Sequence, residues 1–153
     1  MEHIAIMKKS WGLTAKILSG EKTLEERWYK TKRPPFDMAK PGDTIYFKDS
    51  GEPVGLKARI KKVLQFEDLT PEKSEEIVRR YANADLGGGE IPAAIREYVS
   101  GKDYCVIVFF DNVEKIAPFN IDKTGFGAMA AWLCVDDINK IKKWRTFAVF
   151  RGH

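Results

Sequence analysis

The most constraining feature of this sequence is a stretch in which apolar and basic residues alternate strictly, shortly after a tight turn. Over residues 56–61 every second residue is apolar, and the residues between are Lys or Arg. This period of two is typical of a β-strand with one buried and one exposed face. A turn at 49–53, which contains Gly and Pro, separates the stretch from a strand-like segment at 44–48. We therefore predict a β-hairpin with strands over 44–48 and 54–66.

Further segments of strand or helix character lie on both sides of this hairpin. Strands are expected over 3–8, 23–29, 104–110, 113–119 and 144–151. Helices are expected over 10–19, 70–81 and 92–99, and a further short helix, capped by Asp136 or Asp137, is expected to end at 142. Residues 83–90 are expected to form a Gly-rich connection. We assign no conformation to residues 125–135. Short strands without regular strand–helix alternation predict an α+β fold, a small β-barrel of about six strands with helices packed around it.

The length of 153 residues and the 44% share of hydrophobic residues are typical of one compact domain spanning residues 1–153. No window approaches the roughly 18 uninterrupted apolar residues of a membrane span, and the first residues have the pattern of a strand rather than of a signal peptide. The cysteines are Cys105 and Cys134, so neither a disulfide framework nor a four-thiolate metal site is expected. We expect a cytoplasmic protein that uses no cofactor and no membrane partner.

The formal charge of +4 is a mild basic excess and does not by itself indicate a nucleic-acid partner. Its placement on the alternating strand is more informative, because Lys57, Arg59 and Lys61 share one strand face. This face is either a solvated outer surface whose charges discourage strand pairing or a stripe that contacts phosphates. The second interpretation makes Lys57 and Arg59 candidate ligand-binding residues.

One short segment, residues 20–27, carries side chains suited to a binding or catalytic site. Gly20 allows a sharp turn after the first helix, Lys22 stands at the start of the next strand, and Glu25 and Arg27 share a strand face. Arg offers a planar fork for phosphate or a base edge, Lys a point charge or nucleophile, and Glu a proton acceptor. The segment indicates a nucleotide-like ligand; alternatively, Glu25 and Arg27 only pair with each other and fix the opening of the barrel.

The spacing of Gly20, Lys22, Glu25 and Arg27 resembles the Gly-x-Lys-x-x-Glu-x-Arg motif of the ASCH domain family, in the PUA-like superfamily. The neighbouring segments are similar in order: a strand and a short helix precede the motif, and a Pro-Gly-Asp turn leads into a later strand. The resemblance covers about residues 3–119. Residues 120–153 are not assigned to the family core and are interpreted as a C-terminal extension of it.

This resemblance implies a small barrel with a cleft, lined by Lys22, Glu25 and Arg27, that binds RNA or nucleotides. One branch of the family is similar to amidohydrolases that act on acetylated cytidine, and another is ribonuclease-like. In the amidohydrolase branch a Thr stands where this chain has Glu25, which cannot supply the same hydroxyl. That branch also takes an acid from the helix after the hairpin, for which Glu75 and Glu76 are the candidates.

Aromatic residues flank the motif, and aromatic faces are what nucleobases stack on. Trp11 is expected either to form a wall of the cleft or to pack in the core. Trp28 falls on the strand face opposite to the Glu and Arg of the motif and is expected to be a core residue. His3 and His153 lie at the chain ends, so neither a metal site nor a Cys–His nucleophile pair is indicated.

These observations lead to three functional hypotheses. In the first, which we adopt, the protein binds RNA, a nucleotide or a modified nucleoside through Trp11, Lys22, Glu25, Arg27, Lys57 and Arg59. In the second, it is an enzyme, an amidohydrolase of modified nucleosides with Lys22 and Glu25 as catalytic groups, or a ribonuclease-like enzyme. In the third, the charged cleft is structural and the protein acts through contacts with a partner.

Overall fold

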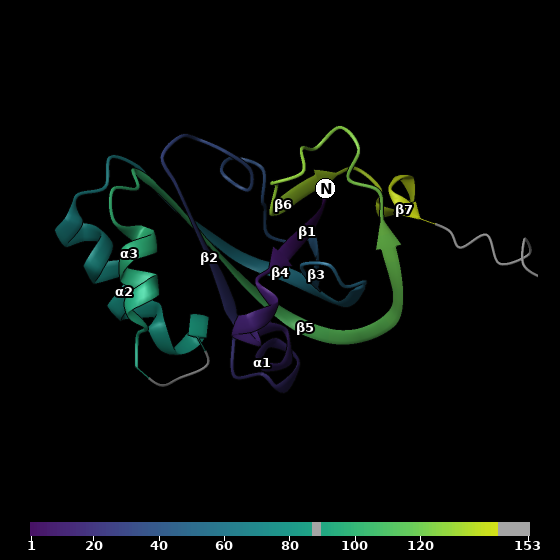
Figure 1. The fold of residues 1–153 in the computed structure, drawn as a ribbon, viewed down its shortest axis with the longest axis horizontal. Coiled ribbons are helices and arrows are strands. Elements are labelled where there is room, and N and C mark those ends of the chain that lie inside the picture. Colours follow the sequence, from purple (N-terminus) through teal and green to yellow (C-terminus); the bar gives the residue numbers. More distant parts are fainter. Residues whose placement is uncertain (87–89, 144–153) are drawn as a thin grey trace, which may run out of the picture.

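The computed structural model describes residues 1–86 and 90–143, and in it a strongly curved β-sheet forms a half-barrel with helices beside it (Figure 1). The strands are β1 (Glu2–Met7), β2 (Leu24–Tyr29), β3 (Thr44–Asp49), β4 (Val54–Phe66), β5 (Tyr104–Ile121), β6 (Trp132–Val135) and β7 (Lys142–Lys143). The helices are α1 (Leu13–Ser19), α2 (Pro71–Leu86) and α3 (Ala93–Val99), with short 3-10 turns at Lys9–Trp11 and Ile138–Lys140. None of the helices in the described part of the chain is long and apolar enough to cross a membrane.

The order of the strands across the sheet is β2-β5-β4-β3-β1-β6, and β7 pairs with the end of β5. β1 and β3 are parallel, and the other neighbouring pairs are antiparallel. The sheet is therefore mixed, and β2 and β6 stand at its two ends. This architecture confirms the expected α+β class, with an open half-barrel in place of a closed barrel.

The hairpin predicted from the alternating pattern is confirmed as β3 and β4, which pair in antiparallel register. Leu56, Ala58 and Ile60 are buried, whereas Arg59 is exposed and Lys57 is half-buried. The strand period thus assigned the two faces of β4 correctly over residues 56–60, because Leu56, Ala58 and Ile60 pack in the cluster inside the half-barrel and the residues between them face outward.

The core has a layer on each side of β2 and β5. Ile17, Ile45 and Phe47 belong to the cluster inside the half-barrel. Ile77, Ile95 and Trp28 belong to a second cluster, in which α2 and α3 cover the outer side of β2 and β5. Helices α2 and α3 lie together at one end of the molecule in Figure 1. Strand β2 is consequently buried on both faces, although it is an edge strand.

Two expected elements differ from those observed. The segments 104–110 and 113–119 form one strand, β5, because β4 pairs with it on both sides of Asn112, although Asn112 has a positive φ of 54°. Asn is among the residues that tolerate this conformation. Helix α2 continues to Leu86, so the prediction of its end near 81 is wrong. Lys16 donates a hydrogen bond of 2.9 Å to the Leu86 carbonyl in the last turn of α2. No local sequence pattern predicts this contact.

The C-terminal segment contributes directly to the sheet. Residues of β6 pair with β1, so part of 120–153 lies beside the first strand of the chain. The short helix expected from Asp136 or Asp137 to residue 142 is a three-residue 3-10 turn, Ile138–Lys140, which the Asp137 carboxylate caps by accepting the Asn139 N–H at 2.9 Å, and residues 142–143 form β7. The strand expected over 144–151 lies outside the described residues.

His3 joins β1 to β6 in a buried cluster that the sequence did not reveal. Its Nε2 lies 2.8 Å from Asp43 Oδ2, and its Nδ1 accepts the Trp132 indole N–H at 3.1 Å. Cys134 Sγ lies 3.3 Å from the same Nδ1. Burial lowers the pKa of His3 and raises the pKa of the Cys134 thiol to about 11. Both groups are therefore neutral near pH 7, and the contact between them is a packing contact rather than a thiolate–imidazolium pair.

The lowered pKa of His3 predicts an acid-sensitive fold. The neutral ring stabilises the native state above pH 6.5, the value of a free His, and this contribution is lost as the pH falls below it. We expect wild type to lose more free energy of unfolding than His3→Gln between about pH 7.5 and pH 5. Chemical denaturation of both proteins across this range measures the difference, and parallel pH profiles would contradict it.

Candidate functional site

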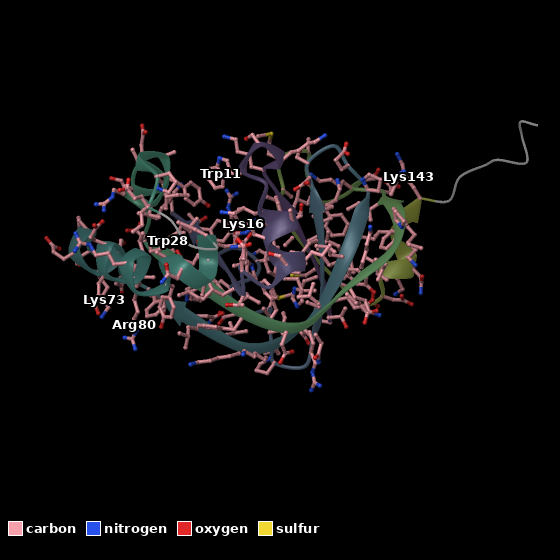
Figure 2. The ribbon with its side chains drawn as sticks, turned by 90° about the horizontal axis from the view of Figure 1, so that it is seen from below. Trp11, Lys16, Trp28, Lys73, Arg80 and Lys143 are labelled. Atoms are coloured by element: carbon pink, nitrogen blue, oxygen red, sulfur yellow. The ribbon has the colours of Figure 1, made fainter. Side chains whose placement is uncertain are left out.

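A cavity of about 410 Å3 opens where the edge strand β2 meets the end of β1, the turn before α1, and helices α2 and α3. Its apolar wall is formed mainly by Trp11, Leu13, Trp28, Leu86, Ile95 and Tyr98. Its polar residues are Lys8, Glu25, Glu26, Arg27 and Asp85. Figure 2 labels Trp11 and Trp28 in this region. The size and the apolar lining with a few polar groups are those of a small-molecule site.

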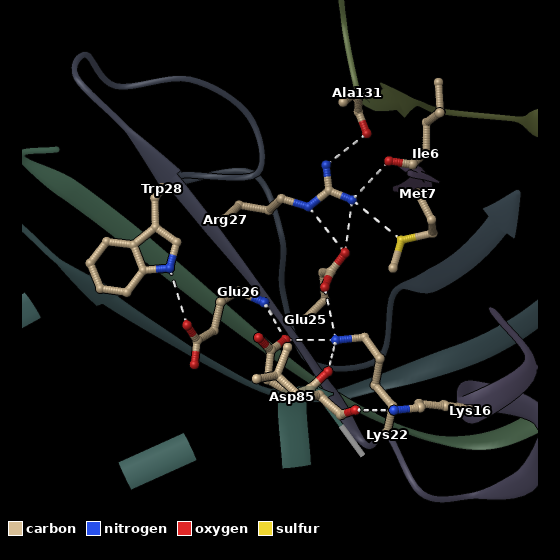
Figure 3. A network of polar contacts seen from close by, with 11 residues as sticks. Ile6, Met7, Lys16, Lys22, Glu25, Glu26, Arg27, Trp28, Asp85 and Ala131 are labelled. Atoms are coloured by element: carbon tan, nitrogen blue, oxygen red, sulfur yellow. Dashed lines mark hydrogen bonds and ion pairs between the residues drawn. The ribbon is translucent and has the colours of Figure 1, made fainter. Parts of the chain in front are cut away.

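Strand β2 supplies polar residues from both of its faces, because it is an edge strand that borders the cavity. Gly20 ends α1 with a φ of 86°, in the left-handed region that suits glycine, and turns the chain toward β2. Glu25 and Arg27 then point to one side of β2, and Glu26 and Trp28 to the other (Figure 3). Alternation separates these residues between the two faces, and the edge position of β2 lets both faces contribute two carboxyl groups and a guanidinium to a single cavity.

The Arg27 guanidinium connects β2 to the other end of the open sheet (Figure 3). It donates hydrogen bonds to the carbonyls of Ala131, at 2.9 Å, and Ile6, at 3.2 Å. It also donates to Glu25 Oε2 from Nε and Nη2, at 3.2 and 2.9 Å, and lies 5.2 Å from the Trp132 ring centre. Burial by itself lowers the pKa of Arg27, but the Glu25 carboxylate outweighs it and the pKa is raised. Arg27 is a charged link between β2, β1 and the segment before β6.

Lys22 lies beneath the cavity and is 1% exposed. Its ammonium binds Glu25 Oε1 at 3.0 Å, Asp85 Oδ1 at 2.6 Å, and the Asp85 backbone carbonyl. These contacts match the three N–H donors of an ammonium. Burial by itself lowers the pKa of Lys22, but the carboxylates of Glu25 and Asp85 outweigh it, and the pKa rises above its usual value. Lys22 is thus a protonated, fully paired cation.

Among the carboxyl groups described at this site, Glu26 has the fewest hydrogen-bond and ion-pair partners. Its Oε1 accepts the Trp28 indole N–H at 3.1 Å, and its Oε2 has no hydrogen-bond partner among the described residues. Burial raises the pKa of Glu26 to about 8, and the nearby Asp85 carboxylate adds to this. Burial also raises the pKa of Asp85, to about 6, against the opposing pull of Lys22. Glu26 is therefore protonated at neutral pH.

The structure brings three of the residues singled out from the sequence, Lys22, Glu25 and Arg27, into one buried network. Glu25 and Arg27 line the cavity, whereas Lys22 is not among its described lining residues, because two carboxylates enclose its ammonium. Trp11 is 39% exposed and stands on the cavity wall, with the Lys8 ammonium 5.4 Å from its ring centre.

The other two candidates, Lys57 and Arg59, are not among the described residues that line this cavity. Lys57 lies 3.7 Å from Glu114 on β5. Arg59 borders a separate hollow beside Gly42 and Asp111. These placements follow from the outward face of β4, which points away from the half-barrel interior.

Sequence reasoning missed Glu26 and Asp85. Glu26 shares a buried face of β2 with Leu24 and Trp28. An acidic residue between two apolar residues of one strand face was the sequence signal that could have identified it. Asp85 becomes part of the site only because α2 extends past residue 81. Trp28 is confirmed as a core residue, at 2% exposure, and it also borders the cavity.

The two helix acids considered from the sequence lie elsewhere. Glu75 accepts from Arg79 at 3.0 Å and from Arg96 at 2.7 Å, and Glu76 is exposed. Asp85 is therefore the acid that α2 brings to Lys22. In the part of the chain that the structure describes, no group of three or more His, Cys, Asp or Glu residues is arranged to hold a metal ion.

Solved structures with a similar fold include the ASCH protein from Zymomonas mobilis, with a TM-score of 0.62 and 15% sequence identity over 88% of this chain and 87% of that chain. Two single-substitution mutants of that protein each give a TM-score of 0.64, with 14% and 15% identity, over 91% of this chain and 93% and 91% of theirs. No family model and no curated protein matches the sequence. The chain therefore has the α+β fold of these ASCH proteins, as its motif led us to expect.

Proposed function

We propose that this protein binds RNA or a nucleotide by taking a base into the cavity beside β2. The observation that carries the proposal is the composition of that cavity, which combines aromatic walls with hydrogen-bonding groups at the floor. Trp11, Trp28 and Tyr98 offer flat or edge contacts of the kind that unstacked bases use. Glu25, Glu26 and Arg27 lie among them. A planar base would stack on the aromatic walls with its ring and form hydrogen bonds to the polar groups with its edge.

The charges at the site favour a base inside the cavity and a phosphate at its rim. The Arg27 and Lys22 cations are already bound to carboxylates and carbonyls. A phosphate would have to displace these partners. Lys8 is the exposed cation among the described cavity residues, and it stands beside Trp11. An exposed lysine at the rim suits a phosphate and makes binding dependent on salt.

The same geometry weighs against hydrolysis with Lys22 as nucleophile or base. Such a lysine must lose its proton near neutral pH. The paired carboxylates instead raise the pKa of Lys22 and enclose its ammonium. Binding is the function that this arrangement supports better.

The test is a fluorescence-anisotropy titration with labelled single-stranded RNA and a panel of nucleotides, at several salt concentrations. We expect binding at low salt that weakens as salt rises. Lys8→Ala should reduce the salt dependence, whereas Lys73→Ala, at an exposed position on α2 outside the cavity, should leave it unchanged. An absence of binding to every probe at low salt would refute the proposal.

The stacking role of Trp11 gives a separate prediction. Trp11→Ala should weaken binding by roughly 5- to 150-fold, which corresponds to about 1–3 kcal/mol for one base stacked on an aromatic ring. Leu18→Ala is the matched control, since Leu18 is an exposed apolar residue of α1 that is not among the described cavity residues. Equal affinities of both variants would remove Trp11 from the binding site.

A further inference from the structure

A second hollow, of about 300 Å3, adjoins the cavity beside β2. Its volume reaches the lower end of the range of small-molecule pockets, about 300–1,000 Å3. It lies where the segment leading into α1 meets the end of α2 and the start of α3. The cavity and the second hollow share much of their wall, namely Trp11, Leu13, Leu86, Ala94 and Ile95. The two spaces are therefore neighbouring parts of one cleft.

The second hollow has a mainly apolar wall. Beyond the shared residues, the described residues that line it are Lys16, Glu90 and Pro92. The Lys16 ammonium is already engaged, because it donates to the Leu86 carbonyl at 2.9 Å. Glu90 is exposed and offers an acceptor to an amino group. Ribose hydroxyls or a phosphate would lie here against apolar groups with few partners, so the second hollow suits a flat ring better.

Trp11 is the aromatic residue that the cavity and the second hollow share among the described residues. It ends the 3-10 turn before α1 and is 39% exposed. A large exposed ring is available for stacking, and in proteins that bind single strands successive bases stack on such rings. A ring that borders two adjoining spaces is placed to contact a base in each of them.

Lys8 supplies an exposed cation at the same ring. Its ammonium lies 5.4 Å from the centre of the Trp11 ring, and among the described residues no carboxylate forms an ion pair with it. Two bases that both contact Trp11 place the phosphate that joins them close to this ring. Lys8 can then exchange its contact with the ring for one with the phosphate, because its side chain is long and flexible.

We propose that the protein binds two consecutive nucleotides of a single-stranded RNA, with one base in the cavity beside β2 and the neighbouring base in the second hollow. Trp11 contacts both bases, and Lys8 binds the phosphate that joins them. This inference rests on the proposed function, because the first base occupies the cavity already assigned to it. Bases that enter such spaces are unpaired and unstacked from one another. The ligand is thus a segment of at least two nucleotides rather than a free mononucleotide.

The experiment is calorimetric titration of the full chain with pairs of probes that carry the same charge. One probe of each pair is a dinucleoside monophosphate made from cytidine, uridine, adenosine or guanosine. The other is the methyl ester of the matching nucleoside 3′-phosphate, which keeps one base and the singly charged phosphate and lacks the second base. We expect the dinucleoside monophosphate to bind about 5- to 150-fold more tightly, the usual gain from one more stacked base.

Pro92→Phe tests the second hollow directly. Pro92 is exposed and lines the second hollow, but it is not among the described residues that line the cavity. A larger side chain there narrows the second hollow, so the variant should bind both probes of a pair with similar affinity. Its affinity for the methyl ester should stay within about twofold of the wild-type value, which also shows that the variant is folded.

Two more variants complete the test. Glu90→Phe narrows the second hollow from an exposed position outside the helices and should have the same effect as Pro92→Phe. Glu97→Phe, at an exposed position on α3, is the matched control, since Glu97 is not among the described residues that line either space. It should keep the wild-type preference for the dinucleoside monophosphate.

The outcomes distinguish the inference from the proposal on which it rests. A dinucleoside monophosphate that binds wild type no more tightly than its methyl ester overturns the inference and leaves base binding intact. A preference that persists in a narrowed variant that still binds the methyl ester does the same, because the second base then lies elsewhere. If wild type binds neither kind of probe and no RNA or nucleotide at low salt, the proposed function itself is refuted. A preference lost in the two narrowed variants and kept in Glu97→Phe supports both.

Discussion

Replacing Arg27 by Met is expected to lower the free energy of unfolding by about 3 to 5 kcal/mol, the usual result of removing one partner from a buried ion pair. The substitution keeps an apolar stem of similar length, so that the loss reports on the guanidinium. The carbonyls of Ile6 and Ala131 would lose their shared donor, and Glu25 would retain only Lys22. The connection between β2 and the far end of the half-barrel would be removed.

Urea denaturation measures this loss, and hydrogen exchange locates it. The Ile6 N–H, which donates to the Ala131 carbonyl at 2.9 Å, should exchange faster in Arg27→Met. Arg79→Met is the matched control, because Arg79 is exposed on α2, and it should change stability by less than about 0.5 kcal/mol. A loss below about 1 kcal/mol in Arg27→Met would show that the linkage across the open sheet contributes little.

The second large effect is expected for Lys22→Met. This change leaves the Asp85 carboxylate buried without its cation and leaves Glu25 with Arg27 alone. We expect a loss of about 3 to 5 kcal/mol at pH 7. Lys22→Met combined with Asp85→Asn should recover part of it, because the unpaired charge is then removed. Lys73→Met, at an exposed position on the same helix as Asp85, is the control and should have little effect.

The pH dependence of this loss follows from the shifted pKa values. The raised pKa of Lys22 means that its contribution is complete below 10.5 and is lost only as the pH rises above that value. Burial by itself raises the pKa of Glu25, but Lys22 and Arg27 outweigh it, and the lowered pKa makes its contribution present above 4.5 and lost in acid. The difference between wild type and Lys22→Met should therefore be largest near neutrality and shrink in acid, first below about pH 6 as Asp85 takes up a proton and further below pH 4.5 as Glu25 does. A difference that stays constant down to pH 3 would contradict the ion-pair explanation.

Local patterns predicted the elements whose cause is local. The alternation over residues 56–61 assigned the buried and exposed faces of β4, because a strand's side chains take opposite sides whatever lies next to them. The separation of two positions between Glu25 and Arg27 placed both on one face of β2 for the same reason. Trp28 was assigned to the core by that period alone. The motif spacing led to the ASCH fold, which the structural similarities confirm.

Patterns failed where a distant contact decides the local structure. The last turn of α2 depends on Lys16, 70 positions away in the chain. The bend at Asn112 divided one strand into two expected ones, because the pairing of β5 with β4 holds the strand together across the bend. The alternating pattern of β4 predicted that Lys57 and Arg59 share one face, but it could not predict which cavity that face would border.

The amino-acid sequence by itself determined which side chains of residues 20–27 share a face and that they sit on a strand after a glycine turn, because these properties follow from backbone geometry. Only the tertiary structure decided that Lys22 is enclosed by two carboxylates, that Arg27 spans the open sheet, and that Glu26 is left without a cation. Those outcomes depend on burial and on Asp85, Ile6 and Ala131, which lie outside the segment 20–27 in the sequence. The pKa and the pairing of an ionisable group in a protein are set by such surroundings.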